Sequence, residues 1–302
     1  MRYVLHHWSY DPFLWCALVL AAWHELGLRR LLLRTRPDRR RRRRMRSAWF
    51  YSGVALLYIA LGSPIDYWGY RYFYLHMIQH LLLMFAVPSL IVTGAPWLPL
   101  LLAVPLRVRR HVLNAVLHGG WSRPLRWTGR LLLRPAVVLV VFNVAMVGWQ
   151  IPGPFDLSER NRIVHVWVMN GSMLLVGLLF WLQIIASPPL RVRNTLASQA
   201  VLLLATNVIM WILAMSMSLF AHHSWYSVYD HVAGVQMAAF SDQLLGAGIL
   251  WVCGDLWSIP ALVVVVRRLI IREEGDVNSA IERMLGQGAG EQLKRSRAPG
   301  ST

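Results

Sequence analysis

The sequence has few cysteines, few acidic residues and almost no lysine. Of its 302 residues, 2 are cysteine and 14 are Asp or Glu, and Lys294 is the single lysine among 31 basic residues. Only 15% of the residues are charged, whereas a soluble protein carries about a quarter. A disordered basic protein would lack the 56% of hydrophobic residues found here. The composition excludes both classes and favours a membrane protein, although one with a net charge of +17.

Several common site signatures are missing as well. The sequence contains no HExxH motif of zinc proteases, no Gly-rich phosphate loop with Lys and Ser/Thr, and no CxxC pair. The two cysteines, Cys16 and Cys253, lie far apart within apolar segments, which argues against a secreted-type disulfide framework. A paired-thiolate metal site is therefore excluded, and any bound metal would need His and Met as ligands.

Long apolar runs are what the sequence has instead. A helix that crosses about 30 Å of hydrocarbon needs about 20 residues. Seven runs approach that length and predict an all-α, polytopic membrane protein with a bundle of about seven transmembrane helices in one domain, 1–272. The remaining segment, 273–302, is polar and is expected to be a partly disordered cytoplasmic tail. The seven runs are 12–33, 47–63, 72–93, 131–151, 164–186, 198–220 and 236–266.

The basic residues divide unequally between the two sides of this predicted bundle. The loops after the first, third and fifth runs, together with the tail, hold 27 of the 31 Lys and Arg residues. The positive-inside rule places these loops in the cytoplasm, so the N-terminus is expected outside and the C-terminus inside. The run Arg39 to Arg44 lies in the first of these loops. We interpret it as a topology determinant with some attraction to anionic lipid, in preference to a nucleic-acid motif.

Histidine and methionine gather on the opposite, arginine-poor side. His76 and His80 are four residues apart and therefore share one helix face. Met84 continues this face one turn deeper, and Met77 lies about 100° round the helix from His76. Imidazole and thioether donors together suit Cu(I) or Cu(II) better than calcium, magnesium or manganese. Two readings stay open, because the histidines could simply hydrogen-bond across helices and a methionine in a spanning helix is more often packing than ligand.

Further polar residues on the same side join this candidate set. His165 and Met169 repeat the four-residue spacing on the fifth run. Asp242, followed by Gln243, lies a turn or two inside the seventh run, where a carboxylate is costly unless it is paired. We expect Asp242 to orient an imidazole as a hydrogen-bond acceptor. The connection between the sixth and seventh runs adds three histidines that could equally be incidental and solvent-exposed: His222, His223 and His231.

These residues resemble a known family, the CtaG-type membrane-integral cytochrome c oxidase assembly factors. The resemblance covers roughly residues 45–260, and the His-Met-x-x-His block with its Ser-Pro-Ile-Asp lead-in is its most specific part. The matching positions of functional interest are His76, Met77, His80, His165, Asp242 and Gln243. The similar blocks are Ser63-Pro64-Ile65-Asp66, His76 to Leu83, Pro88, Thr93-Gly94-Ala95-Pro96, Phe180-Trp181 and Ser241 to Val252.

The resemblance implies a non-enzymatic protein of the bacterial inner membrane that helps to mature a haem–copper oxidase by handling copper ions on the outer side. The partners it implies are a cytochrome c oxidase subunit, an extracytoplasmic copper chaperone and the lipid bilayer, with no nucleic acid. Two other functions stay open. A copper transporter would continue a relay of ligands through His24 and Asp255, and a haem-binding redox protein would use His76 and His165 as axial ligands.

Overall fold

The structure is a computed structural model, and its regular structure is helical throughout the part of the chain that it describes, with no strand there. The all-α class predicted from the apolar runs is therefore confirmed. Side chains are described up to residue 271, apart from residue 117. The described residues are 8, 12–120, 122–190, 194–230, 232 and 234–297.

Each of the seven predicted runs forms a long helix or a stack of helical segments. These are α1 (Pro12–Leu33), α2 (Pro37–Gly62), α4 (Phe73–Leu81) with η2 (Leu82–Ala86) and α5 (Val87–Gly94), α9 (Pro135–Gly148), η3 (Val164–Asn170) with α11 (Gly171–Ile184), α12 (Leu196–Ser218) and α13 (Ala239–Arg297). Short helices connect them: α3 (Pro64–Gly69), α6 (Trp97–Ala103), α7 (Leu106–His118), α8 (Arg123–Leu132), α10 (Pro152–Arg160) and η4 (Ser227–Tyr229). Proline begins α1, α2, α3, α9 and α10, because a first helical residue needs no N–H.

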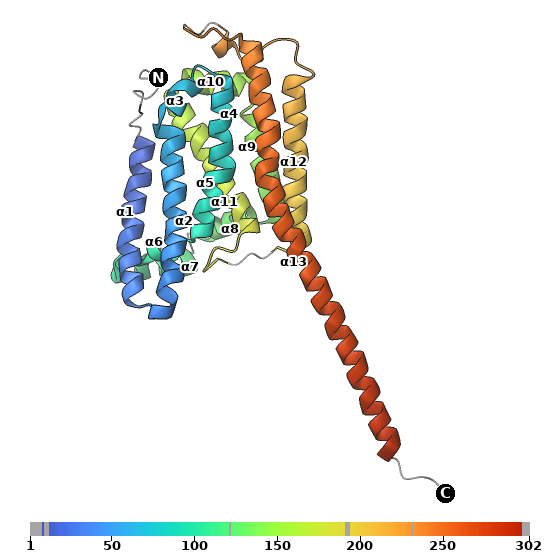
Figure 1. Cartoon of the computed structure of the whole chain (residues 1–302). Coiled ribbons are helices and arrows are strands. Elements are labelled where there is room, and N and C mark those ends of the chain that lie inside the picture. Colours follow the sequence, from blue (N-terminus) through green and yellow to red (C-terminus); the bar gives the residue numbers. More distant parts are fainter. Residues whose placement is uncertain are drawn as a thin grey trace.

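Four of the described helical segments are long and apolar enough to cross a membrane: Phe73–Gly94, Val164–Ile184, Leu196–Ser218 and Ala239–Ile271. A fifth span results if α8 and α9, which bend by 78° at their junction, are counted together. Helices α1 and α2 run beside the bundle (Figure 1), but the Arg, His and Glu residues within them lower their apolar character. The length and apolar character of these helices indicate a membrane protein. The number of seven spans and the orientation of the termini stay predictions.

Three predicted boundaries differ from the structure. Helix α2 begins at Pro37, so the arginine run expected in a loop before residue 47 is helical. The run 131–151 is not one straight helix, because Pro135 holds Arg134 in an extended conformation (ψ 133°) and separates α8 from α9. At the other end of the chain, α13 is one helix of 59 residues that projects beyond the bundle (Figure 1). Its backbone is helical over 273–297, where the sequence predicts a polar and partly disordered tail.

The helices pack around one core in which the segment 73–94 is central. Helix α4 packs against α13, and α5 packs against α2 and α11. Two glycines permit these close approaches: a Cβ atom at Gly177 would lie 2.7 Å from the carbonyl oxygen of Met84, and one at Gly246 would lie 2.5 Å from the ring of Phe73. Small residues on α11 and α13 therefore bring both helices directly against this central segment.

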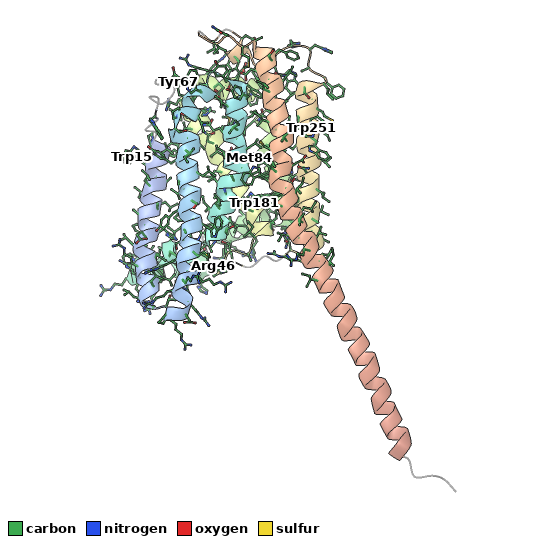
Figure 2. All side chains as sticks on the ribbon, viewed as in Figure 1. Trp15, Arg46, Tyr67, Met84, Trp181 and Trp251 are labelled. Carbon is green, nitrogen blue, oxygen red and sulfur yellow. The ribbon has the colours of Figure 1, made fainter. Side chains whose placement is uncertain are left out.

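The two ends of the bundle differ in chemistry. We call one the histidine end, formed by α3, α10 and the first turn of α4, and the other the arginine end, formed by α6, α7, α8 and the start of α2 (Figure 1). Figure 2 shows Tyr67 at the histidine end and Arg46 at the arginine end. The long extension of α13 leaves the bundle at the arginine end.

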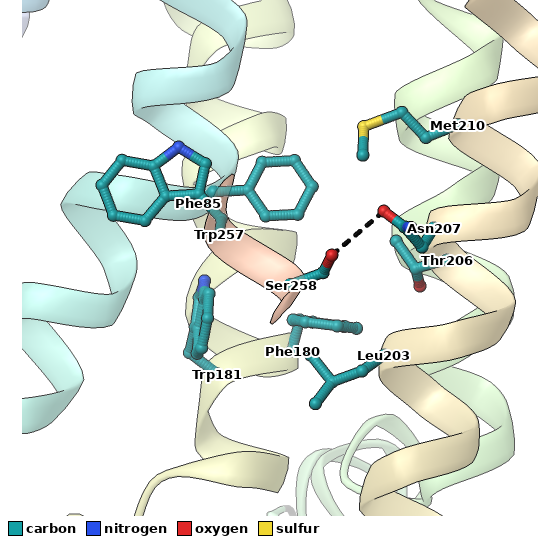
Figure 3. A pocket seen from close by; sticks show the side chains of 9 residues that line it. All are labelled: Phe85, Phe180, Trp181, Leu203, Thr206, Asn207, Met210, Trp257 and Ser258. Atoms are coloured by element: carbon teal, nitrogen blue, oxygen red, sulfur yellow. Dashed lines mark hydrogen bonds between the residues drawn. The ribbon is translucent and has the colours of Figure 1, made fainter. Parts of the chain in front are cut away.

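A small cavity lies between α11, α12 and α13, next to η2 (Figure 3). Its volume of about 10 Å³ is close to the minimum that holds a water molecule. A hydrogen bond from Ser258 Oγ to Asn207 Oδ1 (3.1 Å) forms one side of it. The cavity is too small for an organic ligand. Its lining residues are Phe85, Phe180, Trp181, Leu203, Thr206, Asn207, Met210, Trp257 and Ser258.

Candidate metal centre

His76 and His80 lie one turn apart on α4, with their Nε2 atoms 2.6 Å from each other. The prediction that they share one helix face is confirmed. The side-chain amide of Gln150 donates to Nδ1 of His80 (3.1 Å), and Tyr226 Oη donates to the amide oxygen of Gln150 (3.2 Å). His80 in its neutral form therefore carries its proton on Nε2 and donates to His76 Nε2, which leaves the proton of neutral His76 on Nδ1.

A second pair meets the first from other elements. His165, near the start of η3, lies with Nδ1 2.8 Å from Oε1 of Glu159 on α10. The same Glu159 oxygen lies 3.4 Å from Nδ1 of His76. His76, Glu159 and His165 thus offer donor atoms that all lie within 4.8 Å of one another, the spacing of a metal site.

Two ring nitrogens stand out in this cluster, and one of them, His76 Nδ1, carries the proton of the neutral ring and must lose it before it can bind a metal. His165 Nε2 and His76 Nδ1 are buried and have no hydrogen-bond partner. Because Nδ1 of His165 donates to the Glu159 carboxylate, its Nε2 keeps a lone pair, and the carboxylate fixes the orientation of the ring. An ion held by all three residues would instead take the place of the proton on Nδ1. A buried imidazole nitrogen without a partner is costly in a purely structural cluster, so its presence favours a binding role.

Aromatic side chains close the cluster off from water. The ring of Phe155 lies 4.9 Å from that of His76, and the ring of Tyr70 lies 4.7 Å from that of His165. His76, His165 and the Glu159 side chain are 0%, 1% and 4% exposed. This burial raises the pKa of the Glu159 carboxyl, while the hydrogen bond from His165 opposes the rise. The cluster is a dry polar site, in which electrostatic interactions are strong.

Asp242 holds the helix that presents the histidines, because its carboxylate accepts the backbone N–H groups of Phe73 (2.6 Å) and Tyr74 (3.0 Å) at the start of α4. The predicted role, orienting an imidazole directly, is therefore replaced by helix capping. Gln243 supports the loop between α12 and α13, because its amide oxygen accepts the backbone N–H of Trp225 and its amide nitrogen donates to the carbonyl of Met217.

The Ser-Pro-Ile-Asp stretch at 63–66 has a similar positioning role. Ser63 Oγ accepts the N–H of Ile65 (3.2 Å) and begins α3. Gln79, between the two histidines, donates to Asp66 Oδ1 (2.9 Å) and to the carbonyl of Ala60 (3.0 Å). Together these bonds attach α4 to α2 and α3, which explains why the stretch accompanies the histidine block.

The methionines of the prediction are buried at different places. Met77 lies beside Gly246 on the α13 side of α4. Met84 falls within the π-helical segment η2, where the 3.6-residue periodicity that placed it on the face of His80 no longer applies. The sulfur of Met169 accepts a hydrogen bond from Ser158 Oγ (3.3 Å), one residue before Glu159. Of these three methionines, Met169 is the one that forms a hydrogen bond next to the cluster.

The loop after α12 contributes tyrosines in place of the predicted histidines. His222 and His223 are exposed, and His231 lies outside the described residues. The same loop buries Tyr226 against Phe155, with ring centroids 4.2 Å apart, and Tyr229, whose hydroxyl donates to the Gly69 carbonyl.

Three residues of the site escape sequence reasoning: Glu159, Gln150 and Tyr226. The available signal for Glu159 was an acidic residue six positions before His165 on the arginine-poor side. Gln150 and Tyr226 carry no such signal, because only the fold brings α4, the end of α9 and the loop after α12 together.

Fold and site together define a helical membrane protein with a buried histidine–carboxylate cluster near one end of its bundle. Comparison with protein families adds the particular family, since the model of the cytochrome c oxidase caa3 assembly factors (Caa3_CtaG) matches residues 26–272. The chain belongs to this family, and the predicted resemblance is confirmed. Assembly-factor function implies association with cytochrome c oxidase and suggests a non-catalytic role. No curated protein and no solved structure matches the chain.

Proposed function

We propose that this protein is a non-enzymatic factor that holds a copper ion at His76, Glu159 and His165 and passes it to a cytochrome c oxidase subunit. The observation that carries the proposal is the convergence of three buried donor residues, two of which have ring nitrogens without hydrogen-bond partners. Family membership supplies the oxidase. The predicted topology puts the histidine end outside the cytoplasmic membrane of a bacterium, where an extracytoplasmic copper chaperone would deliver the ion.

The donor set suits a cargo that must be released. Imidazole nitrogen is a good copper ligand, and neutral imidazoles exchange more readily than paired cysteine thiolates, for which the sequence has no CxxC motif. In this proposal the ion lies where His76, Glu159 and His165 converge, and it displaces the protons that Nδ1 of His76 and Nδ1 of His165 carry in the neutral rings. His80, which sequence analysis predicts as a ligand, instead hydrogen-bonds to His76 and to Gln150. In this proposal it positions His76 and does not contact the ion.

Elemental analysis of the protein purified without chelator tests this proposal. We expect stoichiometric copper in the wild type and its loss in His165→Ala and in Glu159→Gln, which keeps the shape of the side chain but removes its charge. His222→Ala is the matched control, because it removes an exposed histidine from the same end of the molecule. Maturation of the oxidase, measured as its activity in cells, should fail in the first two variants only. Copper retained by both, or absent from the wild type, would contradict the proposal.

The haem alternative meets a geometric obstacle. The ring of His76 lies 5.3 Å from that of His165 and 4.2 Å from that of His80, centroid to centroid, and Phe155 covers it from another side. No space for a planar macrocycle separates the two histidines that would be its axial ligands. An absorption spectrum without a haem band is therefore the expected result.

The transporter alternative requires ligands along the whole span. His24 is buried near the arginine end, where its Nδ1 lies 3.1 Å from the hydroxyl of Tyr51, which in turn donates to Glu25 (2.8 Å). This cluster contains one histidine beside a tyrosine and a carboxylate that also pairs with Arg29. Nδ1 of His24, Tyr51 and Glu25 are bonded to one another, and Nε2 of His24 is buried without a partner. A single histidine at the opposite end of the bundle from His76 does not make a relay of ligands, and we therefore favour the assembly role.

A further inference from the structure

A second cavity, of about 530 Å³, opens at the arginine end between the start of α2 and the segments that follow α5 and α11. Four arginines of α2 line it: Arg39, Arg42, Arg43 and Arg46. Their spacing of three and four residues places them on one face of the helix. The arginine run is therefore not only a solvated charge cluster, because one face of it forms the wall of a cavity.

These arginines are poorly balanced by negative charge. Among the described side chains, Arg42, Arg43 and Arg46 form no ion pair, and Arg39 approaches only the exposed Asp38, at 3.8 Å. Burial lowers the pKa of Arg46, and repulsion from Arg42 and Arg43 lowers it further. Several guanidinium groups around one cavity form a receptor for an anion with several oxygens, such as a phosphate.

Another part of the cavity lining is apolar. It is formed by Leu28 and Leu31 of α1 and by Ala95, Leu98 and Pro99, which lie just after α5 and in α6. A free phosphate would gain nothing from these side chains, whereas a ligand with both a charged head and a hydrocarbon portion would bury against them. The cavity therefore has the two surfaces that an amphiphile requires.

The level of the cavity also fits a lipid. Gly94, in its lining, is the last residue of the span Phe73–Gly94, and Pro188 follows shortly after the span that ends at Ile184. Figure 2 shows Arg46 at this end of the bundle. The guanidinium groups thus lie where membrane spans end, the depth at which phospholipid phosphates are found.

We propose that this cavity binds one anionic phospholipid, with its phosphate among Arg42, Arg43 and Arg46 and the first part of its acyl chains against Leu28 and Leu31. The site is independent of the copper proposal, since it lies at the opposite end of the bundle. It would secure the start of α2 and the turn after α5 to the membrane.

Native mass spectrometry of the full chain in detergent tests this site. With added phosphatidylglycerol we expect a bound lipid that survives millimolar inorganic phosphate, and with phosphatidylcholine we expect no comparable adduct. Arg43→Gln/Arg46→Gln should weaken phosphatidylglycerol binding roughly tenfold or more. The control Arg41→Gln/Arg44→Gln removes the same charge at the same spacing from exposed positions outside the cavity, and should bind almost as the wild type does.

Three results would overturn the proposal: equal binding of phosphatidylcholine, displacement of the lipid by phosphate, or the same loss in both double variants. The control pair also removes the same number of positive charges from the loop, so a change in membrane topology would affect both variants alike. Copper content measured on the same samples should not differ between the two, which separates this proposal from the previous one.

Discussion

Replacement of Asp242 separates helix capping from a direct role at the metal. Asp242 is 2% exposed, and its carboxylate accepts the N–H groups of Phe73 (2.6 Å) and Tyr74 (3.0 Å). These belong to the first turn of α4, whose donors have no carbonyl of their own helix to bind. In Asp242→Ala both donors would be left without a partner in a dry interior.

The cost follows from these two bonds. An unpaired buried donor costs about 1–3 kcal/mol, so two cost about 2–6 kcal/mol. Part of this is recovered, because a buried carboxylate no longer has to be desolvated, and we expect a net loss of about 2–4 kcal/mol in the free energy of unfolding. Asp242→Asn keeps one acceptor and is itself a good capping residue, so its loss should be about 1 kcal/mol.

Thermal unfolding of the purified protein, followed together with its copper content, is the assay. At about 2–4 °C per kcal/mol, Asp242→Ala should lower the midpoint by about 4–16 °C and Asp242→Asn by a few degrees. Because His76 lies one turn from Phe73, copper should be reduced in the Ala variant and largely restored in the Asn variant. An unchanged midpoint combined with lost copper would refute the capping argument and assign the carboxylate to the metal or its ligands.

Two further predictions concern helix packing and the hydrogen bonds that hold Gln150 beside His80. Gly177→Ala would put a methyl group 2.6 Å from Pro88, so it should destabilise the protein by about 1–3 kcal/mol. Gly171→Ala, which meets open space, should not, and equal unfolding midpoints for the two would contradict the packing. Tyr226→Phe removes the hydroxyl that holds the Gln150 amide; copper content should fall, and wild-type content would show that this bond is dispensable.

The helices were predictable because a membrane span has to be apolar over its length. The long apolar runs form helices, and proline shifts some of their ends. Pro135, for example, holds the preceding Arg134 in an extended conformation and is the first residue of α9. The shared face of His76 and His80 was predictable for the same reason, since both lie in regular α-helix before the chain changes to π-helix at Leu82.

The rest of the site could not be predicted, because it depends on contacts between elements. Met84 was assigned to the face of His80 by extending α-helical periodicity through a segment that is π-helical. Glu159 approaches His76 from α10, and nothing in local sequence fixes the packing of α10 on α4. The expectation that Asp242 is paired is confirmed, but its partner is the backbone and not an imidazole ring. The start of α4, which packs against α13, offers two N–H groups that have no acceptor within their own helix.

The segment 73–94 connects the two proposed sites. His76 lies near its start and Gly94 at its end, 18 positions later, which at 1.5 Å per residue is about 27 Å, close to the thickness of the hydrocarbon layer. A lipid phosphate held beside Gly94 would therefore set the depth of the whole segment and keep the histidine cluster near the opposite surface. Copper exchange would then require movement of the covering rings of Phe155 and Tyr70, while the segment that carries His76 stays anchored.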